Sequence, residues 1–251
     1  MADIRQHIQE LFEKNHRITN GFHYTIPSVQ SYPYQWFWDS CFHSIILSHF
    51  DIERAKNELR SLVSHQRDNR VCRACEEAGY RLESLPVLEG RPGQRAMIVG
   101  QAPGVVEGLE RRPWRGRAGR TLRGWLELDE EAFYATFYCV SVTRCYPGRH
   151  PSGRGDRPAT PREQDLCSFW LDWELRLLRP SLVLVVGGLA ARRVLGLTRL
   201  TDCIGGRYAL GEAVALPLPH PSGASGWLNE PANRDRLESA LALVREELAR
   251  I

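Results

Sequence analysis

Four of the seven cysteines in this sequence have the spacing of metal-binding residues. Cys72 and Cys75 form a Cys-x-x-Cys pair that can chelate one centre, and Cys145 and Cys167 lie further along the chain. Four thiolates hold either Zn²⁺ or a [4Fe–4S] cluster, so the spacing leaves both open. The odd number of cysteines and the lack of a secretory signal argue against a disulfide framework. The remaining three cysteines are expected to be unligated: Cys41, Cys139 and Cys203.

Two other segments have the composition of ligand-binding loops. The first is Gly-Gln-Ala-Pro-Gly at residues 100–104, in which glycines let backbone amides approach a ligand and proline stiffens the turn. The second begins at His220, continues as Pro-Ser-Gly, and leads to an apolar pair, Trp227 and Leu228. Each segment taken alone is equally compatible with an ordinary turn after a strand.

The elements that must position these residues alternate between short apolar runs and helical patterns. Continuous apolar runs, typical of strands buried on both faces, occupy residues 96–99, 137–142, 182–186 and 214–218. Helices are predicted at residues 119–128, 161–178, 189–195 and 231–251. We therefore predict an α/β fold, a three-layer α/β/α sandwich around a central, mostly parallel four-stranded sheet. Ligands bind beyond the carboxyl ends of such strands, where both candidate loops lie.

Taken together and in order, these motifs resemble the uracil-DNA glycosylase superfamily, and most of all its iron–sulfur (family four) branch. The resemblance covers about residues 70–250. It rests on Cys72-x-x-Cys75, the segment at residues 100–104, Arg-Pro-Trp-Arg-Gly-Arg-Ala-Gly at residues 112–119, Cys145 with the distal Cys167, and His-Pro-Ser at residues 220–222.

The resemblance implies an enzyme that flips uracil out of DNA and hydrolyses its bond to the sugar. It implies that Trp114 stacks on the flipped base and that His220 stabilises the charge on the departing uracil. The backbone amides of Gln101 and Ala102 would assist, and Ser141 stands where the family has its uracil-reading asparagine.

The same resemblance implies the remaining contacts and the cofactor. Residues expected at the DNA, as a wedge or as phosphate ligands, are Ser222, Ser225, Trp227, Leu228, Arg115 and Arg117. The expected ligands of a structural [4Fe–4S] cluster, with zinc as the alternative, are Cys72, Cys75, Cys145 and Cys167.

Two positions depart from the family pattern. Related enzymes commonly have an acidic residue or asparagine where this chain has Gln101, and glutamine can orient water but cannot act as a general base. Ser141 lacks the amide fork of the family's asparagine, which predicts weaker discrimination of uracil from cytosine and a wider range of deaminated bases.

Residues 1–66 differ in composition from the rest of the chain. They contain both lysines, six of the eight histidines and one glycine. Helices are predicted at residues 4–14 and 52–62, with an aromatic loop at residues 32–43 between them. Residues 20–66 resemble the entry segment of (α/α)-barrel glycoside hydrolases, but are too short to build a barrel that places two carboxyl groups. We predict an inactive helical and aromatic segment at residues 1–66 and a glycosylase-like domain at residues 67–251.

Overall composition limits the remaining possibilities. The chain is 43% hydrophobic and 25% charged with a net charge of +3, which is typical of a soluble globular protein. We expect a cytoplasmic monomer that binds damaged DNA and no membrane. Two alternatives are kept: a module that binds lesions without turnover, or traps them covalently through His150, and a carbohydrate-processing fragment at the N-terminus.

Overall fold

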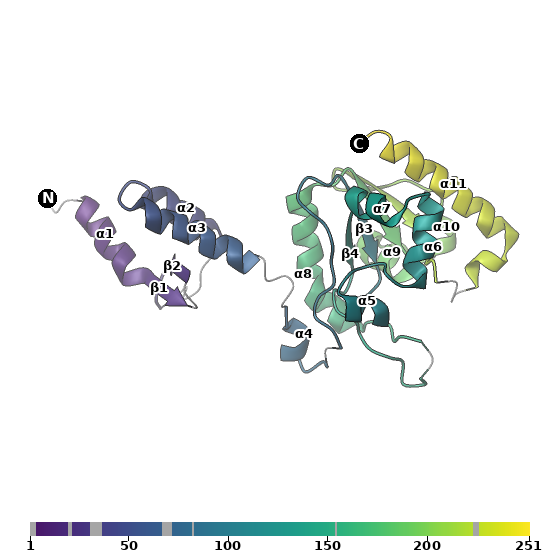
Figure 1. Ribbon diagram of the computed structural model, residues 1–251, viewed down its shortest axis with the longest axis horizontal. Helices are drawn as coiled ribbons and strands as arrows, with labels where there is room; N and C mark the ends of the chain where they lie inside the picture. The colour runs from purple at the N-terminus through teal and green to yellow at the C-terminus, as the bar shows by residue number, and fades with distance from the viewer. Residues whose placement is uncertain are drawn as a thin grey trace. The chain divides into compact units, whose positions relative to one another are not determined.

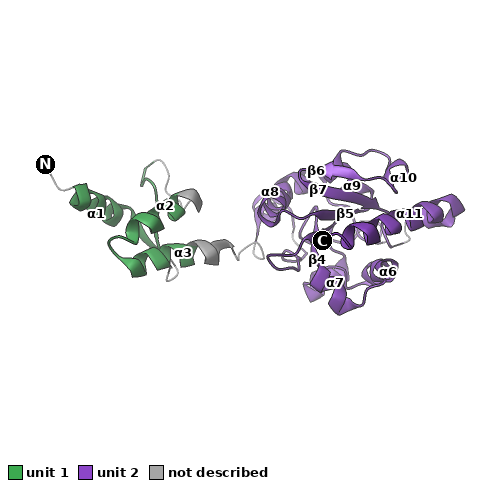
Figure 2. Cartoon of the chain, turned by 90° about the horizontal axis from the view of Figure 1, so that it is seen from above, with its two compact units in different colours: residues 1–69 green, residues 70–251 purple. Residues whose placement is uncertain are grey.

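The computed structural model describes residues 4–19, 22–30, 37–66, 72–81, 83–153, 155–222 and 226–251 (Figure 1). The chain divides into two compact units, Met1–Asn69 and Arg70–Ile251, which Figure 2 colours separately. The division lies close to the change of composition at residue 66. Among the described residues, no helix has the length and apolarity needed to cross a bilayer.

The second unit is built on a five-stranded sheet with the strand order β4-β3-β5-β7-β6. Its strands are β3 (Ala96–Gly100), β4 (Phe137–Ser141), β5 (Leu182–Val186), β6 (Tyr208–Leu210) and β7 (Ala213–Leu218). All neighbours are parallel except β6, which pairs antiparallel with β7 at the edge. Every residue of β3, β4 and β5 is buried, as their continuous apolar sequences predict.

Helices cover both faces of the sheet, so the predicted three-layer sandwich is confirmed (Figure 2). Side chains alternate along each strand, and Ile98 packs with α6 (Arg117–Leu126), α7 (Glu130–Thr136) and α11 (Pro231–Leu248). Its neighbour Val99 packs on the opposite face. The helices on that face are α8 (Pro161–Leu178) and α9 (Gly188–Leu195).

Helix α8 has the bounds that the sequence predicts, because its first turn is strongly capped. The hydroxyl of Thr160 accepts a hydrogen bond from the Glu163 amide at 3.2 Å, and the Glu163 carboxylate accepts one from the Thr160 amide at 2.7 Å. Arg157 holds the same carboxylate with two hydrogen bonds and lowers the pKa of Glu163 to about 2. The helix that carries Cys167 is thus fixed at its start.

Several short elements were not predicted. They are α4 (Ala74–Glu77), α5 (Val105–Glu110), α7, α10 (Leu200–Cys203), a 3-10 helix at Trp227–Asn229, and the edge strand β6. The sheet therefore has five strands and not four. Elements of three to seven residues are too short to show a hydrophobic period, and β6 is only partly buried.

The first unit is small and differs in detail from its prediction. Its elements are α1 (Ile4–Asn15), β1 (His16–Thr19), β2 (Phe22–Thr25), α2 (Phe37–Leu47) and α3 (Ile52–Gln66). The hairpin β1–β2 was not predicted, and residues 37–43 begin a helix where a loop was expected; residues 31–36 lie outside the described part. Apolar residues of α2 do recur at helical spacing, as in Cys41 with Ile45 and Phe42 with Ile46, but the aromatic run that precedes them obscured this period.

Among the side chains of the first unit that the structure describes, few apolar ones are buried. Its cluster consists of Phe12, Leu47 and Ala55. The buried carboxylate of Glu58 accepts hydrogen bonds at 2.7 Å from the Thr25 amide and from a serine hydroxyl of α2. Large apolar side chains remain on the surface, among them Ile4, Phe42 and Ile45.

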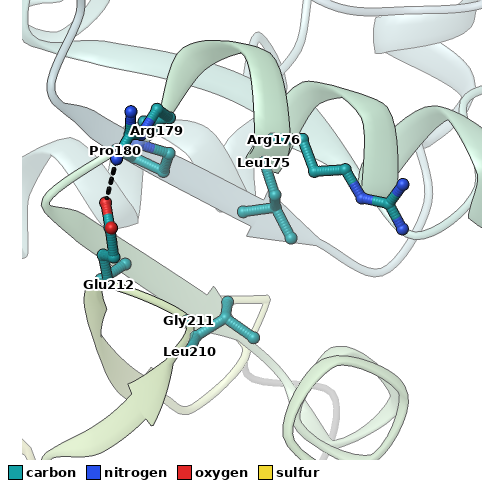
Figure 3. A pocket seen from close by; sticks show the side chains of 8 residues that line it. Leu175, Arg176, Arg179, Pro180, Leu210, Gly211 and Glu212 are labelled. Atoms are coloured by element: carbon teal, nitrogen blue, oxygen red, sulfur yellow. Dashed lines mark hydrogen bonds and ion pairs between the residues drawn. The ribbon is translucent and has the colours of Figure 1, made fainter.

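A surface pocket of about 360 Å³ lies at the amino edge of the sheet, where β5 and β7 begin (Figure 3). Leu175 and Leu210 form part of its lining, and Arg179 pairs with Glu212 at 2.7 Å across it. None of the residues predicted to take part in chemistry lines this pocket.

A chain that begins at residue 67 should fold without the first unit. The apolar clusters on both faces of the sheet contain only residues of the second unit, so the deletion removes none of their contacts. We expect one cooperative thermal transition within about 4 °C of the full chain, which corresponds to roughly 1 kcal/mol in a domain of this size.

Circular dichroism on heating measures this transition. Residues 1–66 by themselves should show no cooperative transition, because the apolar cluster formed by their described side chains is too small to offset chain entropy. Loss of the transition in the shortened chain would show that the first unit is an integral part of the fold.

Candidate active site

The predicted site residues lie at the carboxyl edge of the parallel sheet. Strand β3 ends at Gly100, directly opposite Ser141 at the end of β4. Strand β7 ends at Leu218, two residues before His220. The segments that were selected as motifs therefore start from one edge, as expected for parallel strands.

Trp114, Ser141 and His220 come together at this edge. A Cβ atom on Gly100 would lie 3.0 Å from Trp114 Cζ2 and 3.3 Å from Ser141 Oγ, so both side chains meet over that glycine. The rings of Trp114 and His220 have centroids 6.4 Å apart and are inclined by 38°. Trp114 and Ser141 are buried and His220 is half-buried.

The indole N–H of Trp114 is available as a hydrogen-bond donor. Its Nε1 is buried and has no hydrogen-bond partner among the described residues. A buried donor without a partner destabilises the free protein, and a polar ligand that supplies an acceptor removes that cost. The tryptophan is therefore equipped to hydrogen-bond as well as to stack.

Gln101 lies on the same edge but is packed against a different strand end. A Cβ on Gly187, just after β5, would lie 2.7 Å from Gln101 Nε2, and Gly187 has a φ of +95° that favours glycine. The carbonyl of Gln101 accepts the Thr143 amide at 3.2 Å. Ala102 is half-buried in the same loop. Gly187 was not recognised from the sequence, although a Gly-Gly pair follows the strand there.

His220 is held in one orientation and one tautomer. Its Nδ1 accepts the Ser222 backbone amide at 3.3 Å and lies 2.8 Å from the Ser222 hydroxyl. Because a backbone N–H only donates, Nδ1 is unprotonated and the ring proton is on Nε2. Burial lowers the pKa of His220 below 6.5, and the negative charge of Glu107 opposes that shift. The imidazole is thus a neutral donor at pH 7.

Glu107, which sequence reasoning missed, joins two of the motifs. Its carboxylate accepts the Gly104 amide at 3.1 Å and the Gly116 amide at 2.7 Å. One oxygen thus binds the loop that follows β3, and the other binds the segment that carries Trp114. The signal in the sequence was a glutamate three residues after the glycine that precedes α5.

The backbone at Trp114 is held in a left-handed conformation with a φ of 61°. The Arg123 guanidinium donates to the Trp114 carbonyl at 2.8 Å, and the Tyr134 hydroxyl donates to the carbonyl of Pro113. Gly119 approaches so closely that a Cβ there would lie 1.7 Å from the Trp114 oxygen. Neighbouring groups thus impose a conformation that a tryptophan rarely adopts.

The arginine-rich segment at residues 111–123 is partly neutralised by carboxylates of the same chain. Arg112, Arg115 and Arg123 all pair with Glu130, and Arg115 also pairs with Glu110 at 2.6 Å. Arg115, predicted to contact DNA, therefore already binds two carboxylates. The sequence shows where arginines occur, but not which carboxylates the fold places next to them.

Among the described residues, three further arginines are either exposed without an ion pair or paired with a carboxylate. Arg117 is exposed and has no ion pair within the described part of the chain, so it remains suited to a phosphate contact. In the segment between β4 and α8, Arg144 is buried against Glu174, and Arg157 binds Glu163.

The structure describes part of the loop that follows β7 and carries His220. Ser225 lies outside the described residues. Trp227 donates from Nε1 to Thr201 Oγ1 at 2.8 Å and packs against the core, and Leu228 packs there as well. Both side chains are half-buried.

The four thiols predicted to bind a cluster influence one another electrostatically. Burial, reinforced by repulsion from the other three sulfurs, raises the pKa of Cys145 to about 12, and burial with repulsion from Cys167 and Cys72 raises that of Cys75 to about 11. Cys75, Cys145 and Cys167 line one small cavity. Within the described residues, no three His, Cys, Asp or Glu side chains form a group that could hold a single metal ion.

The surroundings of these sulfurs fit a thiolate-bound group. The Trp170 indole donates to Cys72 Sγ at 3.3 Å, and the backbone amide of Arg144 donates to Cys167 Sγ at 3.3 Å. Such N–H donors stabilise thiolates around metal centres. The other cysteines have separate roles: Cys139 is buried in β4, and Cys203 donates to a backbone carbonyl.

Arg144 links the thiols to the slot formed by Trp114, Ser141 and His220. Its backbone contacts Cys167, and its guanidinium donates to the Ser141 carbonyl and to the Glu174 carboxylate. One buried residue thus touches both a predicted cluster ligand and the strand end that bears Ser141.

Comparison with known families agrees with this geometry. The family described as the Uracil DNA glycosylase superfamily matches residues 88–244, which include the slot and two of the four thiols. The chain belongs to the uracil DNA glycosylase superfamily.

Individual members of the superfamily are similar at modest identity. A type-4 uracil-DNA glycosylase of Sulfurisphaera tokodaii is 27% identical over 190 residues, covering 70% of this chain and 79% of the relative. One from Archaeoglobus fulgidus is 29% identical over 200 residues, covering 75% and 94%. One from Thermotoga maritima is 29% identical over 135 residues, covering 54% and 65%.

The expected resemblance of the N-terminal residues to a glycoside hydrolase is also confirmed. A mannosylglycerate hydrolase MGH1-like glycoside hydrolase domain matches residues 32–91. This match extends beyond residue 66 and includes Cys72 and Cys75.

Gly119 and Gly124 provide a matched test of how this glycosylase-superfamily domain holds Trp114. Gly119→Ala places a Cβ against the Trp114 carbonyl, so we expect the free energy of unfolding to fall by about 3 kcal/mol or more. Gly124 lies in the same helix, and a Cβ there would have no atom within 4 Å. Gly124→Ala should raise the free energy of unfolding by about 0.5–1 kcal/mol. Urea unfolding measures both, and equal effects would contradict the close approach at Gly119.

Proposed function

We propose that this chain is a DNA-repair glycosylase that flips uracil out of DNA and hydrolyses the N-glycosidic bond, leaving an abasic site. The observation that carries the proposal is the meeting of Trp114 and Ser141 over Gly100, with the His220 ring 6.4 Å from the Trp114 ring. Similarity to type-4 uracil-DNA glycosylases supports the same activity.

Base recognition follows from the three side chains of the slot. The flat face of Trp114 replaces the stacking that the base loses when it leaves the duplex. Ser141 offers one hydroxyl, which donates or accepts but cannot read two edge atoms as an amide does. Other deaminated bases, such as hypoxanthine and xanthine, are therefore candidate substrates beside uracil.

Bond cleavage depends on stabilising the departing base. As the bond to the sugar breaks, negative charge develops on the uracil oxygens. His220 Nε2–H, fixed by the bond of Nδ1 to Ser222, donates to that charge from a position set before the reaction starts. Gln101 orients the attacking water but accepts no proton, so leaving-group stabilisation carries most of the catalysis.

Contacts with the DNA backbone come from the margins of the slot. We assign phosphate contacts to Ser222, Ser225 and Arg117, the last being exposed and unpaired among described residues. Arg115 would have to leave Glu110 and Glu130 to take part. Leu228 remains the better wedge into the vacated stack, because the Trp227 indole is already hydrogen-bonded to Thr201.

Cys72, Cys75, Cys145 and Cys167 would hold a [4Fe–4S] cluster. The cluster would supply a structural brace through four strong metal–sulfur bonds. The N–H donors from Trp170 and Arg144, and the cavity that Cys75, Cys145 and Cys167 line together, support this assignment.

The glycosylase proposal predicts release of free uracil from a uracil-containing oligonucleotide. His220→Ala should slow single-turnover release by about 10²–10³-fold, the usual effect of removing a fixed donor to an oxyanion. His220→Gln, which keeps an N–H near the Nε2 position, should be less impaired. Arg179→Ala, at the opposite edge of the sheet, should match the wild type.

The pH dependence adds a separate check. The folded-state pKa of His220 lies below 6.5, so the neutral ring prevails at pH 7, and it gains a proton as the pH falls below 6.5. That proton would occupy Nδ1 and break the bond to the Ser222 amide. Activity should therefore decline on the acid side with a midpoint below 6.5, and His220→Gln should lack this limb. Absence of release from uracil, hypoxanthine and xanthine DNA alike would refute the function.

The cluster proposal predicts a brown protein with broad absorbance near about 400 nm and roughly four irons per chain. Cys145→Ser and Cys167→Ser should lose both signals. Cys203→Ser is the matched control, because a hydroxyl can replace the thiol as donor to the Arg199 carbonyl. A colourless protein with stoichiometric zinc would decide for the alternative metal.

A further inference from the structure

The tetrapeptide His-Pro-Ser-Gly occurs twice in this chain. One copy, at residues 220–223, opens the loop that supplies His220 to the slot, and the other occupies residues 150–153 in the segment between β4 and α8. The function proposed above uses only the first copy.

The histidine and serine of the two copies have the same local geometry. His150 Nδ1 lies 2.8 Å from the Ser152 hydroxyl and accepts the Ser152 amide at 3.2 Å; the corresponding distances for His220 and Ser222 are 2.8 Å and 3.3 Å. By the same reasoning as for His220, the ring proton of His150 is on Nε2. The sequence repeat therefore makes the same fixed N–H donor at a second place.

The second copy is presented to solvent. His150 and its neighbour Arg149 are exposed, whereas His220 is half-buried. The segment is a narrow hairpin in which the backbones of Arg149 and Asp156 form an antiparallel β-bridge. The His150 amide donates to the Gly155 carbonyl at 3.0 Å. It projects from the body of the unit in Figure 1. A donor held this way loses little freedom when it binds an external acceptor.

The base of this hairpin touches the first motif loop. A Cβ on Gly104 would lie 3.3 Å from Asp156 Oδ2, and the other oxygen of that carboxylate accepts the Tyr146 hydroxyl at 2.8 Å. The hairpin also starts shortly after Ser141. His150 is therefore attached to the edge of the sheet that carries the slot.

We propose that His150 is a DNA-backbone ligand whose Nε2–H donates to a phosphate oxygen beside the flipped nucleotide. The assignment rests on the proposed function, since that function places DNA at this edge. A phosphodiester is the acceptor that DNA presents outside the base slot, and such contacts fix the position of a protein on the strand. The adjacent exposed Arg149 adds positive charge that favours the same ligand.

The test is the Kd for a duplex that contains one tetrahydrofuran abasic analogue, measured by fluorescence anisotropy. His150→Ala should raise the Kd about tenfold or more, the order expected for one hydrogen bond to a charged oxygen. His150→Gln, which keeps an N–H near the Nε2 position, should return the Kd to within about twofold of the wild type. Arg179→Ala, beside the pocket of Figure 3 at the far edge, should leave the Kd unchanged.

The outcomes separate this inference from the proposed function. An unchanged Kd in His150→Ala would overturn the phosphate contact even if uracil is released normally. A wild-type protein that releases no base would overturn the glycosylase proposal, while the Kd comparison would still decide the role of His150. A denaturant-resistant adduct with uracil DNA that His150→Ala abolishes would overturn the non-covalent role and make His150 a nucleophile.

Discussion

The parallel register of β3 with its two neighbours is the constraint on which the candidate site depends. Because β3 and β4 run in the same direction and pair Gly100 with Ser141, the loops that follow them begin side by side. Pairing of β5 with β7 adds the third loop, which carries His220. A glycine at position 100 completes the arrangement, since a Cβ there would lie only 3.0 Å from Trp114 and 3.3 Å from Ser141 and would crowd both.

A buried ion pair between Arg144 and Glu174 fixes the backbone at the carboxyl end of β4. Arg144 is almost fully enclosed, and Glu174, reached also by the Tyr138 hydroxyl, supplies the opposite charge. Burial raises the pKa of Glu174, an effect that the positive charge of Arg144 counteracts. An enclosed ion pair is costly to break because one charge would remain without a partner. The ion pair thus fixes the backbone segment between Ser141 and Cys145, which contacts both the slot and the thiol of Cys167.

Two kinds of interaction shape the slot formed by Trp114, Ser141 and His220. Stiff local contacts, such as Glu107 between two loops and Arg123 on the Trp114 carbonyl, set the positions of the walls. Burial then sets the chemistry, by keeping His220 neutral and by leaving the Trp114 N–H without an acceptor among the described residues. Both effects leave an N–H donor at the slot that a ligand with an acceptor atom would satisfy.

By itself, the amino-acid sequence determined the α/β class, the four parallel strands, helix α8 and the motif residues, because apolar runs, caps and motif spacing are local in the chain. Three of those residues, Trp114, Ser141 and His220, do converge. The tertiary structure alone decided which charges are free, since Arg115 and Arg144 find carboxylates far along the chain. It also decided the short elements, the bridging role of Glu107 and the packing of Gln101 on Gly187. These depend on contacts between distant segments, whose distances no local pattern encodes.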